Sequence, residues 1–234
     1  MSTIRLVNIH QFVNIGLCPP KNFIDMWSFN AAIPDAHYIV TVQTPLNRSK
    51  TVFLADWSRR RGDDDDGRNA KSEGVIVVKF GGQDAAYSRL EYESKAYEKL
   101  QHLQGSVVPN VYGLYKSKVQ RQTVGCLLME YCPQDLFFER QTNELAYAAL
   151  QLHLSGLCHG GLSDLKHVRR DNQGNIRIID FANCFEHRCA GIAYGTQCGC
   201  SELTAIQNLA LPIHQQLPPR VRHGSHVGSS RHRH

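Results

Sequence analysis

The chain has 234 residues, a formal net charge of +5 and a hydrophobic fraction of 42%. This length can bury one good core, so a two-lobed single unit is as reasonable as two separate domains. No stretch of about 18 uncharged apolar residues is present, and the N-terminus, MSTIRLVNIHQF, lacks the apolar region of a signal peptide. We therefore expect no membrane association and a cytoplasmic or nuclear location.

The positive charge is concentrated near the C-terminus. Residues 218–234 contain four arginines and no acidic residue, which leaves the rest of the chain at +1. A body so close to neutral gives no electrostatic reason to expect nucleic-acid binding. The Arg-, His-, Gly- and Ser-rich tail itself is expected to be disordered.

The first part of the chain predicts mainly β-structure. Residues 1–36 have aromatic anchors but no clear period, and we interpret them as an N-terminal extension. The segments 37–44 and 51–57 are rich in β-branched and aromatic residues and predict a hairpin. The hydrophilic residues 58–74 that follow predict a disordered insertion.

One lysine stands out in the next segment. The run VIVVKF predicts a buried strand whose one charged residue is Lys79. An unpaired buried ammonium is unfavourable, so this lysine needs a carboxylate partner. The helical pattern at 87–103 supplies Glu93, with Glu91 and Glu98 as alternatives on the same helix. We expect a Lys79–Glu93 ion pair.

Residues 159–183, HGGLSDLKHVRRDNQGNIRIIDFAN, contain the most informative pattern of the chain. A kinase catalytic loop has the form H-x-D-L-x-x-x-N, followed by a β-hairpin and Asp-Phe-Gly. His159 and Leu162 match this loop, and Asp180 ends the apolar strand after the hairpin turn. The position of the catalytic aspartate, however, is Gly161.

These residues, together with GCSEL at 199–203, resemble a protein-kinase-like family widespread in mushroom-forming fungi. That family is typified by a loop of the form H-G-D-L-S/T-D-x-R/K-H-x-x-R and a downstream Gly-Cys-x-Glu-Leu. The resemblance covers residues 75 to about 203, a little over half of the chain. It implies an α+β, protein-kinase-like two-lobed fold. A five-stranded antiparallel N-lobe would span 37–132, and a short, mainly helical C-lobe would span 133–217.

The same resemblance implies a site for ATP and Mg²⁺. Lys79 and Glu93 would form the ion pair that holds the α- and β-phosphates, and Asp180 would bind the metal. Glu130 and Cys132 would lie in the connector between the lobes, where backbone groups meet an adenine ring.

Several departures from the family pattern weaken catalysis. Gly161 removes the carboxylate that positions the acceptor hydroxyl, and Lys166 replaces the second Mg²⁺ ligand with a cation. No G-x-G-x-x-G lies between the first two predicted strands. The remaining catalytic candidates are His159 and Asp164. A shift of three residues favours a capping or ion-pairing role for Asp164 within the loop.

The interpretation that follows is a pseudokinase that binds nucleotide or a protein partner without efficient phosphotransfer. The alternative is an active, atypical ATP-dependent phosphotransferase, acting on a protein or a small molecule, that uses Lys79 and Asp180. A third reading is an interaction module that binds no nucleotide. Whether the chain is an enzyme is left open by the sequence, as is its oligomeric state.

Eight cysteines occur without a secretion signal, which favours reduced thiols. Cys184, Cys189, Cys198 and Cys200 form a cluster that includes His187. Their C-x4-C and C-x-C spacings lack the usual C-x2-C knuckle. We therefore expect unligated thiols at this cluster rather than zinc.

Overall fold

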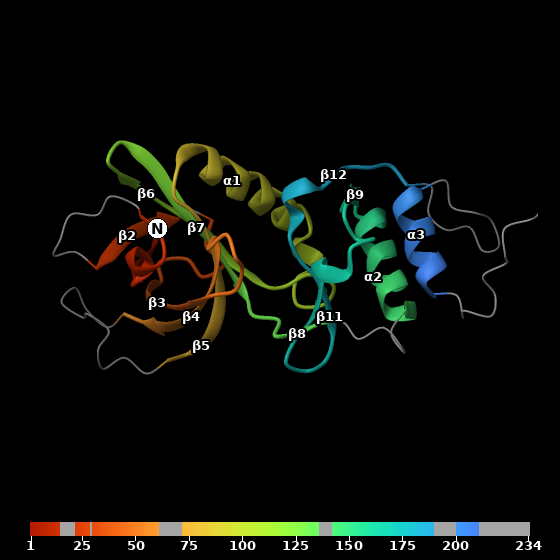
Figure 1. The fold of residues 1–234 in the computed structure, drawn as a ribbon, viewed down its shortest axis with the longest axis horizontal. Helices are drawn as coiled ribbons and strands as arrows, with labels where there is room; N and C mark the ends of the chain where they lie inside the picture. The colour runs from red at the N-terminus through yellow and green to blue at the C-terminus, as the bar shows by residue number, and fades with distance from the viewer. Residues whose placement is uncertain (15–21, 29, 61–71, 136–141, 190–199, 211–234) are drawn as a thin grey trace, which may run out of the picture.

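The computed structural model describes residues 1–14, 22–28, 30–60, 72–135, 142–189 and 200–210. The strands of the first 130 residues gather at one end of the molecule, and the two C-terminal helices lie at the other (Figure 1). Most of the expected insertion at 58–74 and the whole tail at 218–234 lie outside the described residues. Among the described residues, no helix is long and apolar enough to cross a membrane.

A closed seven-stranded barrel forms the N-terminal part. Its order is β1-β2-β6-β7-β5-β4-β3, and β3 closes it by pairing in parallel with β1, while the other neighbours are antiparallel. The strands are β1 (Ser2–Val7), β2 (Phe23–Ser28), β3 (His37–Pro45), β4 (Val52–Arg59), β5 (Gly74–Gly81), β6 (Val111–Val119) and β7 (Gln122–Glu130).

The expected five-stranded antiparallel sheet is wrong because residues 1–36 supply two further strands. β1 alternates buried and partly exposed residues, and its Ile4 and Leu6 point into the barrel interior. β2 joins the far edge of the sheet, where Trp27 pairs with Lys116 of β6. This pairing and the parallel β1–β3 pairing remove both sheet edges.

The α+β, protein-kinase-like two-lobed fold is corrected on the same ground. A closed mixed barrel with three helices among the described residues is not that architecture. The protein-kinase-like and transferase classes, which rested on the resemblance of residues 159–183 and 199–203, lose the support of the fold with it. The architecture gives no support to ATP binding either.

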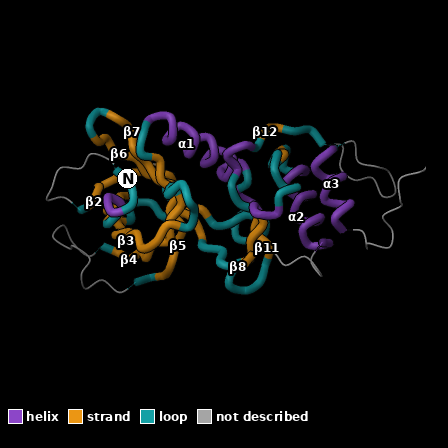
Figure 2. The backbone as a smooth tube through the Cα atoms, viewed as in Figure 1, coloured by secondary structure: helices purple, strands orange, loops and turns teal. Residues whose placement is uncertain are grey.

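Among the described residues, one α-helix covers the barrel and two build the C-terminal part (Figure 2). They are α1 (Asp84–Lys99), α2 (Thr142–Leu154) and α3 (Ser201–Ala210). α1 packs against β5, β6 and β7, whereas α2 packs against α3. The approach of α1 to β7 is close because Gly125 has no side chain. A Cβ atom there would lie 2.3 Å from the ring of Tyr87.

The remaining described elements are short strands and 3-10 helices. A three-stranded sheet has the order β11-β10-β8, and β12 pairs with β9. These strands are β8 (Gln134–Asp135), β9 (Leu157–Cys158), β10 (Val168–Arg170), β11 (Ile176–Ile178) and β12 (Phe185–Glu186). The 3-10 helices are η1 (Ile9–Gln11), η2 (Gln101–Leu103), η3 (Leu165–His167) and η4 (Phe181–Asn183).

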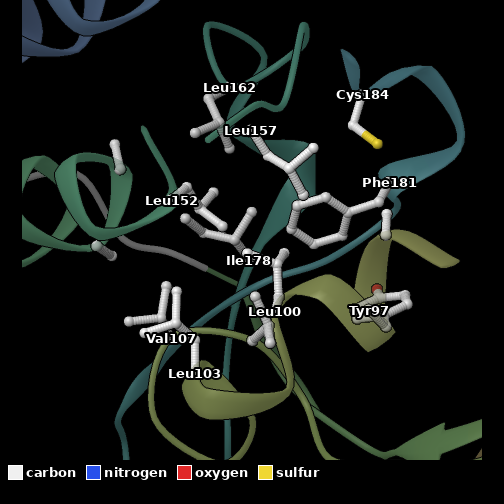
Figure 3. Close-up of a cluster of buried hydrophobic side chains, with 14 of the residues drawn as sticks. Tyr97, Leu100, Leu103, Val107, Leu152, Leu157, Leu162, Ile178, Phe181 and Cys184 are labelled. Carbon is white, nitrogen blue, oxygen red and sulfur yellow. The ribbon is translucent and has the colours of Figure 1, made fainter. Parts of the chain in front are cut away.

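Two apolar clusters hold these parts together. One fills the barrel, with Phe53 fully buried in it. The other joins α1 to α2 and to the segments that follow α2, as Figure 3 shows for Tyr97, Leu152 and Phe181. Tyr97 and Phe181 meet edge to face, with ring centroids 5.0 Å apart. This second cluster fixes α1 relative to the chain that carries Asp180.

Candidate functional site

Lys79, Glu93 and Asp180 form the centre of the candidate site. The Lys79 Nζ atom lies 2.7 and 2.8 Å from the two carboxylate oxygens of Glu93 and 2.8 Å from Oδ1 of Asp180. Glu93 is 2% exposed and Asp180 is 40% exposed. The expected ion pair between β5 and α1 is thus formed, and Glu93 rather than Glu91 or Glu98 makes it.

Each of these side chains is positioned by its element. Along β5, Val78 and Phe80 point into the barrel interior, so the intervening Lys79 faces away from it toward α1. Asp180 comes directly before η4, with a left-handed φ of 69°. Such a backbone conformation is uncommon for a residue other than glycine and marks functional sites in many proteins.

Backbone hydrogen bonds secure this arrangement. The amide of Phe181 donates to Oε1 of Glu93 at 3.2 Å. The amide of Asp180 donates to the Tyr97 hydroxyl at 3.3 Å. Both acceptors belong to α1, so the helix holds the strained turn at Asp180 in place as well as the lysine.

The charges of the site favour an ionised lysine. Burial opposes the charge of Lys79, but the two carboxylates outweigh it and raise the pKa of the ammonium. Burial works against ionisation of Asp180 as well, yet contact with Lys79 lowers the pKa of this carboxyl. Burial lowers the pKa of His167, whose Nδ1 is 3.6 Å from Oδ2 of Asp180. The half-exposed carboxylate of Asp180 is therefore the group available to a cation.

A cavity of about 440 Å³ opens beside this cluster. Its volume falls within the range of about 300–1,000 Å³ that is typical of small-molecule sites. Lys79 and Asp180 line it together with Glu130 and Cys132, the two residues expected near an adenine ring. Its apolar walls come from both parts of the chain and include Val52, Val77, Met129 and Ile179.

The catalytic candidates of the 159–167 loop do not form a catalytic pair. His159 is buried, and its Nε2 lies 2.9 Å from the carbonyl oxygen of Ile179, to which it donates. Asp164 accepts from the amide of Lys166 at 3.2 Å and pairs with the Lys166 ammonium at 2.5 Å. Asp164 therefore caps η3, and it is not among the residues that line the cavity.

Only one carboxylate of the described cavity lining is placed for a metal. The other lining carboxylate, Glu130, accepts from the amide and the side chain of Asn110 and lies 3.8 Å from Nε of Arg177. The expected second ligand position is Lys166, a cation. Mg²⁺ prefers oxygen ligands and retains several waters, so Asp180 with phosphate oxygens and waters fits one ion. The residues fit a nucleotide with one Mg²⁺ and do not fit a two-metal site.

Glu202 of α3 is a buried residue whose role was not predicted. Its carboxylate accepts from the amides of His159 at 3.0 Å, Gly161 at 3.2 Å and Leu162 at 3.3 Å. Burial disfavours its charge, but these bonds and those from His153 and Cys158 lower the pKa of Glu202 to about 2. An acidic residue in GCSEL was a visible signal, but its partners lie about 40 residues earlier in the chain.

The expected cysteine cluster is only partly assembled. Cys189 and Cys200 approach each other, whereas Cys184 is not in that group and Cys198 lies outside the described residues. Cys184 is buried, and its carbonyl oxygen accepts from the Tyr92 hydroxyl at 2.5 Å.

No protein-family model matches the chain, and no curated protein matches it.

Proposed function

We propose that this chain binds a nucleotide together with one Mg²⁺ ion in the 440 Å³ cavity and does not transfer its phosphoryl group efficiently. The observation that carries the proposal is the Lys79 ammonium, held between Glu93 and Asp180 at the edge of a cavity with apolar walls. The resemblance to the fungal family, which residues 159–171 support, remains part of this proposal. A cytoplasmic or nuclear location is also part of it.

The cavity offers complementary chemistry for both ends of a nucleotide. Val77, Met129 and Ile179 provide an apolar surface against which a planar base can pack. Lys79 supplies a fixed positive charge for phosphate oxygens, because Glu93 holds its amine from the side of α1. The contact of Lys79 with Asp180 can then be exchanged for phosphate, which frees the carboxylate for Mg²⁺.

The loop that contains Gly161 offers no general base for efficient phosphotransfer. Gly161 has no side chain, and Asp164 is engaged with Lys166. Loss of a general base lowers a rate by about 10²–10⁴-fold. Phosphotransfer by kinases runs at about 1–100 per second, so the residual rate would be roughly 10⁻⁴–1 per second before the missing second metal ligand is counted.

The test is a calorimetric and thermal-shift titration of the full chain with ATP, with and without Mg²⁺. We expect ATP to raise the unfolding midpoint, because a ligand that binds the native state stabilises it by about 2.7 kcal/mol at 100 times Kd. Mg²⁺ should strengthen binding in the parent but not in Asp180→Asn. The matched control is Asp164→Asn, an exposed aspartate outside the cavity, which should retain the Mg²⁺ effect.

Each contrary outcome has a distinct meaning. Absence of ATP binding would leave the reading of a nucleotide-free interaction module for a protein partner. Equal ATP affinity with and without Mg²⁺ would show that Asp180 only balances the charge of Lys79. Robust metal-dependent ATP turnover by the parent that disappears in Asp180→Asn would overturn the absence of efficient phosphotransfer.

A gain-of-function series examines why turnover is absent. A Cβ atom at Gly161 would meet its nearest neighbours at 3.4 and 3.5 Å, so an aspartate can be introduced without a backbone clash. We expect Gly161→Asp alone to restore little, since Lys166 still places a cation at the second metal position. The double variant with Lys166→Asn should exceed both single variants in a phosphotransfer assay. Equal rates in all variants and the parent would contradict this account.

A further inference from the structure

We propose that the chain binds a zinc ion through His153, His187, Cys189 and Cys200. One potential ligand atom from each residue lies within 4.8 Å of the corresponding atoms of the other three. Two imidazoles and two thiols are a characteristic tetrahedral zinc set. The site is separate from the proposed nucleotide cavity, because none of the four residues lines that cavity.

The separation of Cys200 and His153 agrees with shared coordination. Cys200 Sγ lies 3.6 Å from Nδ1 of His153. Ligand bonds of about 2.3 Å for sulfur and 2.0–2.1 Å for nitrogen give a tetrahedral edge of about 3.6 Å between these atom types. For the other pairs, which lie within 4.8 Å, a contraction of at most about 1.5 Å would complete the tetrahedron.

His187 provides an independent indication of a ligand. Its Nε2 atom is buried and has no hydrogen-bond partner among the described residues. A buried polar atom without a partner is unfavourable by about 1–3 kcal/mol, and native proteins rarely retain one without a reason. The His187 ring meets the His153 ring edge to face, with centroids 5.1 Å apart. A bound cation would satisfy this nitrogen.

Glu202 orients His153 as metal-binding histidines are commonly oriented. His153 Nε2 lies 2.9 Å from the Glu202 carboxylate and donates to it. The other ring nitrogen, Nδ1, is then the one that carries a free electron pair, and it faces Cys200. A carboxylate that fixes the histidine tautomer in this way is the usual outer partner of a zinc-bound histidine.

Two alternative interpretations of these residues explain fewer of the observed contacts. Oxidation could join Cys189 to Cys200, but a disulfide leaves the buried nitrogen of His187 without a partner. A second group, His153 with Cys158 and Glu202, also has close ligand atoms. Glu202 already accepts three backbone amides and the Cys158 thiol, so it is poorly available to a metal.

The site would be structural, because four protein ligands leave no open position for a substrate. It would join the end of α2, the segment after β12 and the residue before α3. The objection from sequence, that C-x2-C is missing, does not apply when the ligands come from three separate segments. Through Glu202, the ion would also steady the loop that contains Gly161.

The test uses the full chain purified under reducing conditions. We expect one zinc ion per chain by elemental analysis. Replacement by Co²⁺ should give the visible absorption of tetrahedral cobalt together with thiolate charge-transfer bands. Those bands can arise only from cysteine, so they separate this site from metal bound by histidines of the C-terminal tail. This measurement needs no substitution and cannot be confused with misfolding.

Variants then assign the ligands. Cys189→Ser and Cys200→Ser should each abolish stoichiometric zinc and weaken the charge-transfer bands. Cys184→Ser and Cys158→Ser should retain both, the first as a matched neighbouring thiol and the second as the test of the alternative group. Glu202→Gln should weaken zinc affinity by about 10–100-fold, as loss of an outer carboxylate does.

Three results would overturn the site. The folded, reduced parent could contain no zinc and give no thiolate bands with Co²⁺. Zinc could persist in the double Cys189→Ser/Cys200→Ser variant, which would assign it to histidines alone. Freshly isolated protein could contain a Cys189–Cys200 disulfide by mass spectrometry.

Discussion

At the scale of single residues, Lys79 is held by two carboxylates that come from different parts of the chain. One cation in an apolar strand requires a partner, and a helical pattern with acidic residues follows it, so the pair with Glu93 could be predicted. Asp180 is 101 residues away in the chain, and only the resemblance, not a local pattern, placed it in the same site as Lys79. His187 was part of the expected cysteine cluster, but the approach of His153 and Glu202 could not be predicted, since no local spacing reports which distant segments meet.

Lys79→Met should be strongly destabilising, because it leaves the carboxylate of Glu93 buried without its cation. Breaking a buried ion pair from one side typically lowers the free energy of unfolding by about 3–5 kcal/mol. The double variant Lys79→Met/Glu93→Gln removes both charges and should be more stable than the single one. Urea unfolding measures both. The exposed Lys118→Met on β6 is the control and should change stability by less than about 0.5 kcal/mol. A double variant no more stable than Lys79→Met would contradict the burial argument.

At the scale of elements, the β10–β11 hairpin is built around one carboxylate. Its turn, the hairpin turn expected before Asp180, comprises Asn172, Gln173 and Gly174. Asp171 organises this turn by accepting from the amide of Gln173 and from the Asn175 side chain, at 2.8 and 3.0 Å. Arg177 reaches the same carboxylate at 2.6 Å.

Arg177 connects the hairpin to the segment between η2 and β6. Its guanidinium donates to the carbonyl oxygens of Ser106 and Gly105 at 2.8 and 2.7 Å. The hairpin thereby holds the chain that leads from η2 into β6. The hairpin turn could be read from local residue types, whereas this connection could not.

Asp171→Asn tests the hairpin through its pH dependence. Burial raises the pKa of Asp171, but hydrogen bonds from Asn175 and Gln173 and the charge of Arg177 lower it overall. A lowered pKa means that the carboxylate stabilises the fold above the ordinary aspartate pKa, and that this contribution is lost as pH falls through the lowered value. At neutral pH, the free energy of unfolding of the variant should be about 3–5 kcal/mol lower than that of the parent. This difference should become smaller as the solution is acidified.

An exposed ion pair serves as the control for the buried pair of Asp171 with Arg177. Asp25 makes a bidentate contact with Arg5 on the barrel surface, and Asp25→Asn should cost only about 0–1 kcal/mol. A difference between Asp171→Asn and the parent that stays constant from neutral to acid pH would show that the charge of Asp171 is not the stabilising feature.

At the scale of the whole molecule, the strands were easier to predict than their arrangement. The hairpin at 37–57 and the buried strands near Lys79 and at 125–130 occur close to their expected positions. β1 was overlooked because six residues of alternation are a weak signal, and its parallel partner β3 lies some 35 residues later. The expected kinase-like architecture failed at this step, since two missed strands turn an open sheet into a closed barrel.

Leu6→Ala should therefore weaken the entire barrel rather than its N-terminus alone. Leu6 is fully buried, and leucine-to-alanine changes in cores lower the free energy of unfolding by about 2–5 kcal/mol. Val7→Ala, at a partly exposed position on the same strand, should have a clearly smaller effect. Hydrogen exchange should show lower protection in β3 and β6 as well as in β1 of the Leu6 variant. Loss confined to β1 would mean that β1 is a detachable addition.

Barrel closure also constrains the order of events during synthesis. Trp27 of β2 and its partner Lys116 of β6 are 89 residues apart in the chain, and β7 ends only at Glu130. At about 5–20 residues per second, the ribosome needs roughly 5–20 s to deliver the missing strands after β2 has emerged. During that interval β1 and β2 have only each other, and β3 after them, so the nascent chain presents unpaired strand edges to chaperones or to neighbouring nascent chains.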